Sequence, residues 1–343
     1  MSTDELTNTE LIRGLYLAFL GREPEAAALT YYRRALTEGD LDPTSLVAAF
    51  QNCEEYRQRQ STASLWVPAG HYYSPIVDVE ALRVDAARVF DRSTPPTGID
   101  LNEDDQLSLI PVLRSLAQDL PFQDTKKDGL LYYFNNPSYG HGDAVVLACM
   151  IRHLRPRRIL EFGCGFSSCV ILDVNRLFFN GEIECTFVDP YPQLLRDLLF
   201  GCDNGSARIV ESRAQDIDLD IVRTLQENDI LFIDSTHVSK AGSDVNFHFF
   251  RSLPTLQTGV FIHFHDVFYP FEYPKEWFFD ENRSWNELYL LRAFLMHNPY
   301  YRVEFFNDFL ACMHADLVRT IPWFERNSGG AIWIQKKSAP ENC

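Results

Sequence analysis

Short apolar runs alternate with helical segments from about residue 157 onward. The runs of strand character cover residues 157–162, 184–189, 207–212, 229–234, 259–266, 301–306 and 330–335. Alternation of this kind predicts a doubly wound α/β fold with a parallel sheet and helices on both faces. The last two runs have no comparably regular helix after them, which favours a reversed pair of strands at the end of the sheet. We therefore predict seven strands.

The first 60 residues differ from the rest, because their apolar positions recur at helical spacing. Glycines at Gly21 and Gly39 are suited to end helices, whereas Pro24 and Pro43 suit first turns. Residues 60–100 are rich in proline, serine and aromatic residues, as expected of an ordered connector. We expect the following parts: a small all-helical domain (1–60), a connector and helical cap over the active site (61–150), and the α/β domain (151–343).

Composition excludes several classes of function. The chain has 343 residues and a formal net charge of −17, so it should repel phosphate backbones, and we expect no nucleic-acid partner. No apolar run is long enough to span a bilayer. The N-terminal segment MSTDELTNTE has no signal-peptide core, so we expect a cytoplasmic protein with reduced cysteines.

A glycine-containing turn follows the first predicted strand. It carries Glu161, Gly163, Gly165 and Ser167. The glycines allow a tight turn and close approach of a ligand, and a helix that begins near Ser167 offers free amides to an anion. Ser168 stands where a dinucleotide site would prefer a third glycine. The motif therefore suits a methionine carboxylate better than a pyrophosphate.

Polar residues also follow the second and third predicted strands. Asp189 ends the second, where an acid can bind both ribose hydroxyls. Tyr191 could then lie against an adenine ring. After the third strand, Gln215 or Asp216 could accept the adenine amino group. The order and spacing of these groups together predict a nucleoside cofactor site.

A second polar group follows the fourth and fifth strands, which we expect to be neighbours. Asp234 and His237 follow one, while His265 and Asp266 end the other, so all four should meet in one crevice. His237 or His265 could act as a base that Asp266 or Asp234 orients. Alternatively, Asp234, His265 and Asp266 could hold a divalent metal such as magnesium. Structural, hydrogen-bonded histidines are the remaining alternative, above all for His263.

An aromatic loop, residues 268–277, follows immediately. It could form a lid or a wall of the acceptor site, for a sugar ring or another flat face. Packing against the helix that carries Trp285, Tyr289 and Phe294 is an equal alternative.

The motifs RRILEFGCGFSS, TFVDPYP, DILFIDSTHVSKAGSDV and GVFIHFHDVFYPFEYP resemble the class I S-adenosylmethionine (SAM)-dependent methyltransferases, in particular the Methyltransf_24 family. The resemblance covers about residues 70–335 and implies a seven-stranded Rossmann-like methyltransferase sheet with SAM as cofactor. One departure is Asp234-Ser-Thr-His237, where the family usually has D-G-D-H. The resemblance implies these contacts: Glu161, Gly163 and Gly165 at the methionine end, Asp189 at the ribose, and Gln215 or Asp216 near the adenine.

A second resemblance concerns the N-terminal helices. The segments LYLAFLGREPEAAALTYYRRALTEGD and FQNCEEY are similar to a bacterial helical module of the DUF4214 type. The resemblance implies docking to other proteins or oligomerisation, and a helical cap is equally compatible with it.

We therefore expect a SAM-dependent methyltransferase, most simply an O-methyltransferase acting on a small molecule or a glycan precursor. The sequence leaves O- and N-methylation open. Two other classes of function remain as alternatives. One is a cephalosporin-hydroxylase-like, metal-dependent enzyme on the same fold, and the other is a non-catalytic binding protein that keeps the nucleotide fold.

Overall fold

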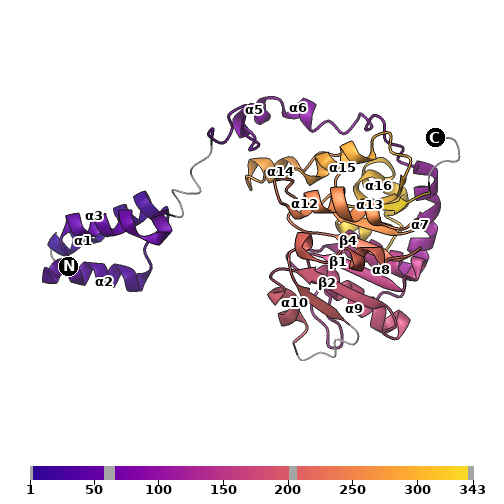
Figure 1. Ribbon diagram of the computed structural model, residues 1–343, viewed down its shortest axis with the longest axis horizontal. Coiled ribbons are helices and arrows are strands. Elements are labelled where there is room, and N and C mark those ends of the chain that lie inside the picture. Colours follow the sequence, from indigo (N-terminus) through magenta and orange to yellow (C-terminus); the bar gives the residue numbers. More distant parts are fainter. Residues whose placement is uncertain (1–2, 58–65, 201–206, 339–343) are drawn as a thin grey trace. The chain divides into compact units, whose positions relative to one another are not determined.

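The chain folds into two compact units, Met1–Asp78 and Val79–Cys343 (Figure 1). The structure is a computed structural model, and it describes residues 3–57, 66–200 and 207–338. No helix in those ranges is both long and apolar enough to cross a membrane. No disulfide joins cysteines within these ranges.

The first unit is helical, with breaks where the glycines predict them. Gly21 and Gly39 both adopt left-handed backbone, with φ of 63° and 79°. Asp42 caps the third helix, because its Oδ1 accepts hydrogen bonds from the backbone amides of Thr44 and Ser45. The elements are α1 (Thr3–Leu15), the π-helical turn η1 (Tyr16–Leu20), α2 (Ala26–Glu38) and α3 (Pro43–Asn52).

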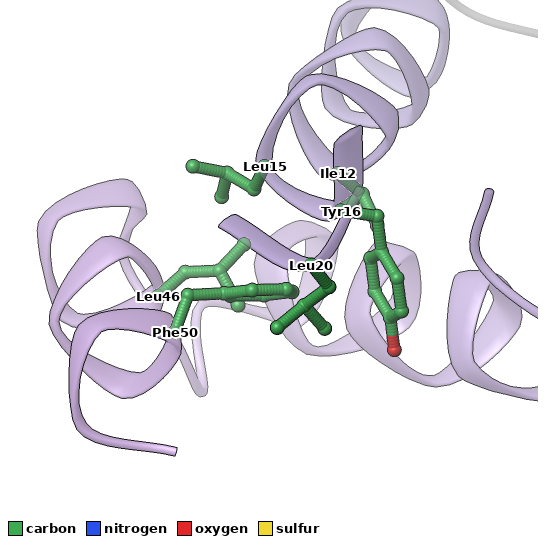
Figure 2. Packing of buried hydrophobic residues seen from close by; sticks show 6 residues of the cluster. All are labelled: Ile12, Leu15, Tyr16, Leu20, Leu46 and Phe50. Carbon is green, nitrogen blue, oxygen red and sulfur yellow. The ribbon is translucent and has the colours of Figure 1, made fainter. Parts of the chain in front are cut away.

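This unit has a hydrophobic core of its own (Figure 2). Phe50 lies at its centre, 4% exposed, with its ring centroid 5.0 Å from that of Tyr16. The buried members of the cluster are Ile12, Leu15, Tyr16, Leu20, Leu46 and Phe50. The apolar positions at helical spacing thus face one another across α1, η1 and α3.

The second unit contains the predicted sheet. Its strand order is β3-β2-β1-β4-β5-β7-β6, with β5·β7 and β6·β7 antiparallel and the other pairs parallel. The seven-stranded sheet and its reversed terminal pair are therefore confirmed. The strands are β1 (Arg158–Phe162), β2 (Glu184–Asp189), β3 (Arg208–Glu211), β4 (Ile230–Ile233), β5 (Phe261–His265), β6 (Tyr301–Phe306) and β7 (Ala331–Lys336).

Helices lie on both faces of this sheet, which gives a Rossmann-like α/β fold (Figure 1). The central strands β1, β4 and β5 are buried on both faces, so they have near-continuous apolar sequences. The longer helices are α7 (Glu103–Ala117), α8 (His141–Leu154), α9 (Phe166–Phe179) and α15 (Glu287–Leu295). The shorter ones are α5 (Val79–Val84), α6 (Ala86–Val89), α10 (Gln193–Leu198), α11 (Asp220–Arg223), α12 (Asp244–Phe247), α13 (Leu253–Thr255), α14 (Lys275–Phe279), α16 (Asn307–Met313) and α17 (Ala315–Val318), with the 3₁₀ turns η2 (Ala214–Asp216) and η4 (Phe324–Arg326) and the π turn η3 (His248–Ser252).

The register of the parallel strands brings their carboxyl ends to one edge. Phe162 of β1 pairs with both Val188 of β2 and Ile233 of β4, and Ile233 pairs with Phe264 of β5. The residues that follow these positions therefore lie side by side, where open α/β sheets bind their ligands.

We predict that Phe50→Ala unfolds the first unit and leaves the sheet intact. Removing this buried ring should lower the free energy of unfolding by about 3–5 kcal/mol. That is most of the stability expected of so small a unit. Peptide-resolved hydrogen exchange should show lost protection in α1–α3 and unchanged protection in β1–β7. Tyr31→Ala, at a side chain that is 67% exposed, is the control. Loss of protection in the sheet would contradict separate cores.

Candidate functional site

The turn after β1 depends on a glycine at position 163. Gly163 has a φ of +80°, and a Cβ atom built on it would lie 1.6 Å from the backbone oxygen of Asp234. Its amide donates to the carbonyl of Val188 at 3.0 Å, while the amide of Asp234 donates to that of Phe162 at 2.9 Å. No other residue fits here, and the ends of β1, β2 and β4 are held together as a result.

Glu161 connects β1 to the start of α9. The carboxyl group is fully buried, and it accepts hydrogen bonds from Ser167 Oγ at 2.5 Å and Ser168 Oγ at 2.6 Å. Burial raises the pKa of Glu161 to about 8, although both hydroxyls act against the increase. Neither Glu161 nor Ser167 lines the neighbouring cavity, and Gly165 does not line it either. In this structure the side chains of Glu161 and Ser167 shape the turn.

Asp189, at the end of β2, holds the backbone on both sides of the predicted cofactor site. Its Oδ2 accepts from the amide of Cys164 at 3.1 Å, and its Oδ1 accepts from the amide of Tyr191 at 2.6 Å. The turns after β1 and β2 are therefore joined through one carboxylate.

A cavity of about 390 Å³ opens at this edge of the sheet. Among the residues predicted to bind a cofactor, the ones that line it are Gly163, Asp189, Tyr191, Gln215 and Asp234. Tyr191 is 84% exposed and stands at the rim. Asp216 does not line the cavity, because its carboxylate points to Arg213, 2.6 Å away. The structure thus brings together groups from four strand ends, as the motif order predicts.

The polar residues after β4 and β5 also converge. Nε2 of His237 lies 3.3 Å from Asp234 Oδ1 and 3.4 Å from Asp266 Oδ2. Nδ1 of His265 lies 3.4 Å from Asp234 Oδ1 and 3.6 Å from Asp266 Oδ2. The predicted crevice is therefore present, and Asp234 belongs both to it and to the cavity. We call these four residues the His/Asp cluster.

The segment before α15 fixes His237 from several sides. Its Nδ1 lies 2.9 Å from Glu287 Oε2, and its ring stacks on Trp285 at 4.4 Å between centroids. Its carbonyl accepts from the amides of Asn286 and Glu287, both at 3.1 Å. These contacts hold a backbone with φ of +57°, which is uncommon for a residue with a side chain.

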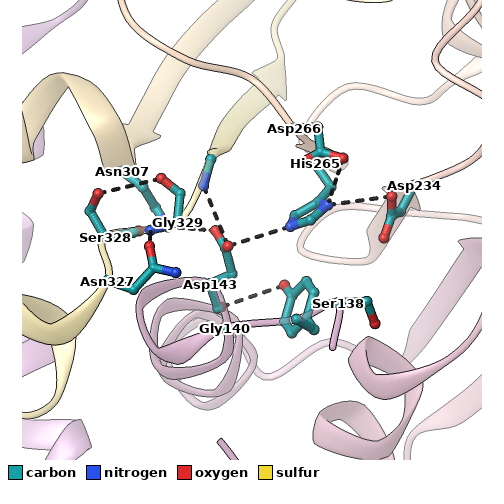
Figure 3. Close-up of polar contacts among 12 residues, drawn as sticks. Ser138, Gly140, Asp143, Asp234, His265, Asp266, Asn307, Asn327, Ser328 and Gly329 are labelled. Atoms are coloured by element: carbon teal, nitrogen blue, oxygen red, sulfur yellow. Dashed lines mark hydrogen bonds and ion pairs between the residues drawn. The ribbon is translucent and has the colours of Figure 1, made fainter. Parts of the chain in front are cut away.

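His265 is held from the opposite side by Asp143 (Figure 3). Nε2 of the imidazole lies 3.4 Å from Asp143 Oδ2. Asp143 also accepts from Asn307 Nδ2 at 3.1 Å and from the amide of Gly330 at 3.3 Å. Sequence reasoning missed both Asp143 and Glu287. The only signal for Asp143 was the position of an acid directly after Gly-His-Gly, at the start of a helix. No motif near Glu287 indicated that its side chain would be buried.

The carboxylates control the charge of both imidazoles. Burial alone would lower the pKa of His237, but its contacts with Asp234 and Glu287 raise that pKa to about 10. Burial likewise disfavours the charged form of His265, but Asp266 and Asp234 raise its pKa well above the usual value. The two histidines in turn hold the pKa of Asp234 well below its ordinary value, against the effect of burial. The neighbouring carboxylates therefore favour the charged form of both rings.

His263 lies outside this cluster. It is fully buried, it stacks on Phe232 at 4.1 Å, and neither ring nitrogen has a hydrogen-bond partner in the described part of the chain. Burial lowers its pKa well below the usual value, so it is a neutral core residue.

The aromatic loop packs against the segment that precedes α15. Tyr273 contacts Trp277, Trp285 and Tyr289 with ring centroids 5.7, 6.3 and 5.8 Å away. The loop therefore packs against these aromatic residues, which is the second of the two alternatives. Trp285 extends the packing to the ring of His237. A second cavity of about 320 Å³ lies beside the loop, with Phe268 and Tyr273 in its wall.

Comparison with known proteins identifies the domain that carries both sites. The family described as "Methyltransferase domain" (Methyltransf_24) matches residues 160–267. An uncharacterized protein of Archaeoglobus fulgidus is 37% identical over 167 residues, which cover 47% of this chain and 74% of the relative. The chain belongs to this methyltransferase-domain family. The match does not extend to residues 1–60, where the resemblance to the DUF4214 type stays a prediction.

Solved structures similar to this methyltransferase-domain protein include two methyltransferases. The SAH-bound methyltransferase PaMTH1 of Podospora anserina gives a TM-score of 0.36 at 18% identity, over 80% of this chain and all of that one. The O-methyltransferase TomG of Streptomyces achromogenes, in complex with SAM, gives 0.37 at 13% identity, over 75% and 95%. Because these TM-scores are low, the fold assignment rests on the strand order itself.

The methyltransferase-domain match contains the whole β1–β5 edge, from Glu161 to Asp266. It excludes Asp143 and Glu287, the two carboxyl groups that hold the outer nitrogens of the histidines. The shared domain therefore supplies the cavity and the cluster, and segments outside the match position the imidazoles.

We predict that Gly163→Ala lowers the unfolding free energy of the methyltransferase domain by at least about 2 kcal/mol. The new methyl group would meet a backbone carbonyl, and alanine is disfavoured at positive φ. Gly165→Ala is the control, since its nearest neighbour outside the turn is the flexible tip of Leu194 at 3.3 Å. Chemical denaturation of both variants checks this, and equal losses would show that contact with Asp234 is not the constraint.

Proposed function

We propose that this protein is a SAM-dependent methyltransferase. The observation that carries the proposal is the position of Asp234, which lines the cavity beside Asp189 and also belongs to the His/Asp cluster. A ligand that fills the cavity thus ends at a cluster able to handle a proton. Titration of the purified protein with SAM and with its demethylated product tests this directly, and no saturable binding of either would remove the proposal.

The geometry around Asp189 is suited to a ribose. Each carboxylate oxygen already accepts one hydrogen bond from a backbone amide, and each keeps a further lone pair that can accept a hydrogen bond from a ribose hydroxyl. Gln215 lies farther along the same wall, where its side-chain carbonyl can face an adenine amino group. Its Nε2 donates to the carbonyl of Gly242 at 2.9 Å, which leaves the amide oxygen free for this role.

The opposite end of the cavity favours a positive charge. Asp234 and Asp266 place carboxylate oxygens around the two imidazoles, and Glu287 and Asp143 stand behind them. A sulfonium group is cationic, so this end of the cavity should attract the reactive end of SAM in preference to the neutral product. We propose that the methyl group lies here, in line with the acceptor atom.

We propose O-methylation of a small molecule or a glycan precursor with a flat ring. The aromatic wall of Tyr273, Trp277 and Trp285 supports this, because it reaches from the second cavity to the ring of His237. A hydroxyl nucleophile must lose a proton, and Nε2 of His237 faces the cluster while Glu287 holds Nδ1. Since His237 is charged in the resting arrangement, it must give up that proton before it can act as the base.

A second candidate is the metal-dependent hydroxylase class. One observation favours it, namely that one imidazole and two carboxylates, of His237, Asp234 and Asp266, have ligand atoms within 4.8 Å of one another, which resembles the donor types of non-haem iron sites. A protein of that class would not need the cavity lined by Asp189, so the SAM titration separates the two candidates.

For the first unit we propose a role in docking or oligomerisation. Leu17 and Tyr31 support it, since they are 51% and 67% exposed and lie outside the buried core of Figure 2.

We predict that Asp189→Asn weakens SAM binding at least tenfold, about 1.4 kcal/mol. The amide keeps the size of the side chain but loses the charge and one acceptor for the ribose. Asp216→Asn serves as the matched control, because Asp216 lies outside the cavity and pairs with Arg213. Calorimetric titration measures both variants. Equal affinity of Asp189→Asn and the wild-type protein would refute the ribose assignment.

We predict that His237→Asn retains SAM affinity within about twofold but loses methyl transfer by at least about a hundredfold. Asparagine tolerates the left-handed backbone, so the loss should reflect the missing imidazole. Release of the demethylated product across a panel of phenols and hexoses measures transfer. His314→Asn, at a histidine paired with Glu103, is the control. Full transfer by His237→Asn would exclude His237 from the reaction.

A further inference from the structure

We propose that the second cavity binds a sugar ring, and that a hydroxyl of this sugar accepts the methyl group. The cavity has a volume of about 320 Å³ and lies beside the aromatic loop. Binding of the sugar is inferred from this cavity alone, whereas the role of the sugar as acceptor rests on the proposed methyl transfer.

The charged side chains in the wall of the second cavity balance one another. Arg92 and Lys275 are cationic, and Glu272 and Glu276 are acidic. A ligand with a net charge would meet groups of its own sign as well as groups of the opposite sign. An uncharged ligand with hydroxyl groups, which both donate and accept hydrogen bonds, satisfies both kinds of side chain. The balance therefore favours a polyhydroxylated ligand over a carboxylic acid or an amine.

Glu272 is held in place through one of its two carboxylate oxygens. Its Oε1 accepts hydrogen bonds from the hydroxyl of Tyr289 at 2.5 Å and from the amide of Tyr273 at 3.0 Å. Its Oε2 accepts no hydrogen bond from any residue within 3–57, 66–200 or 207–338. The side chain is half-buried, and burial raises the pKa of its carboxyl group. An oxygen in this position favours a ligand that donates a hydrogen bond to it.

Arg92 is positioned by a buried carboxylate. Its Nη2 donates to Asp308 Oδ2 at 2.6 Å, and Asp308 is only 7% exposed. The same oxygen accepts from the amide of Tyr269, another residue of the cavity wall, at 2.8 Å. A guanidinium group has five N–H donors in one plane, so its contacts with Asp308 and Cys312 orient it and leave other donors for a ligand. Neighbouring hydroxyl groups on a sugar ring suit this planar fork.

Aromatic rings supply the apolar part of the wall. Phe268 and Tyr273 belong to the aromatic loop, and Phe90 belongs to the segment after α6. The ring of Phe90 is supported by Phe278, 5.9 Å away between centroids. One face of a pyranose carries C–H groups that pack on such rings, while its edge carries the hydroxyls. A phenol would fill the apolar part but would leave charged side chains desolvated and without partners.

The cavity lies next to the His/Asp cluster. Phe268 follows Asp266 by two residues. The hydroxyl of Tyr273 accepts from the amide of Leu288 at 3.1 Å, directly after Glu287. Burial is the main cause of the raised pKa of this hydroxyl, and the nearby charges of Glu287 and Asp266 add to it. A sugar in the cavity is thus close to the groups proposed to handle a proton.

The proposed step needs no reactant besides SAM and the sugar. A hydroxyl oxygen of the sugar forms a bond to the methyl carbon while the bond between that carbon and the sulfur of SAM breaks. The electron pair of the broken bond stays on sulfur, which leaves as a neutral thioether. The hydroxyl proton passes to the cluster or to solvent, and the product is a methyl ether of the sugar.

Sugar binding can be measured without SAM. Saturation-transfer NMR titrations of the full chain compare methyl glycosides of glucose, galactose, mannose and rhamnose with catechol, benzoate and benzylamine. We expect at least one glycoside to bind, and to bind at least about tenfold more tightly than each aromatic compound. Absence of binding by every glycoside, or tighter binding of an aromatic compound, would overturn the proposal.

Two variants locate the bound sugar. Glu272→Gln keeps the accepting Oε1 but loses the charge, so it should weaken binding of the glycoside at least about fivefold. Phe268→Leu keeps an apolar side chain but loses the flat face, so it should weaken binding about three- to tenfold. Glu211→Gln and Phe250→Leu change residues outside the cavity and are the matched controls. Unchanged affinity in both cavity variants would contradict binding in the second cavity.

The results for the two proposals can be told apart. SAM binding without sugar binding would defeat the sugar proposal alone, and sugar binding without SAM binding would defeat the methyltransferase proposal alone. For a protein that binds both, mass spectrometry of the glycoside after incubation with SAM tests the acceptor role. We expect a singly methylated glycoside, and its absence would exclude the bound sugar as the acceptor.

Discussion

The site depends on the close approach of β1 and β4 at Gly163. Because this glycine has no side chain, the carbonyl of Asp234 can lie where a Cβ would otherwise be. That contact brings Asp234 to the border between the cavity and the His/Asp cluster, so its carboxylate faces both. With a larger residue at 163, β4 would have to move away from β1, and the cavity lined by Asp189 would lose its connection to the cluster.

Buried charge is the second constraint, and it explains the helices outside the family match. Isolated buried ions are costly, whereas ions with good partners are tolerated. Asp143 at the start of α8 and Glu287 at the start of α15 supply those partners to His265 and His237. The same two carboxyl groups also fix which ring nitrogen faces the cluster. The same contacts thus balance the charge of the imidazole rings and fix their orientation.

Much of this arrangement could be predicted from the sequence, for identifiable reasons. Strand ends in a parallel sheet share one edge, so Asp189, Asp234 and Asp266 could be placed by counting strands. The structure confirms that the fourth and fifth strands are neighbours, and it brings the two histidines together with the aspartates.

What the sequence could not supply was the direction of individual side chains. Glu161 has the position of a ligand residue, yet it is bonded to Ser167 and Ser168, and Asp216 turns to Arg213. Partners from distant segments were also missed, because neither periodicity nor a local motif links Glu287 to His237 across 50 residues.

The proposed methyl transfer also has an electrostatic basis. Carboxyl groups outnumber imidazoles in and around the cluster, since Asp143, Asp234, Asp266 and Glu287 surround His237 and His265. Such a site is most stable when a further cation is present. The sulfonium of SAM is such a cation, and Asp234 is the residue of the cluster that also lines the cavity. The formal net charge of −17 acts in the same direction, because a negative protein attracts cationic ligands more than anionic ones.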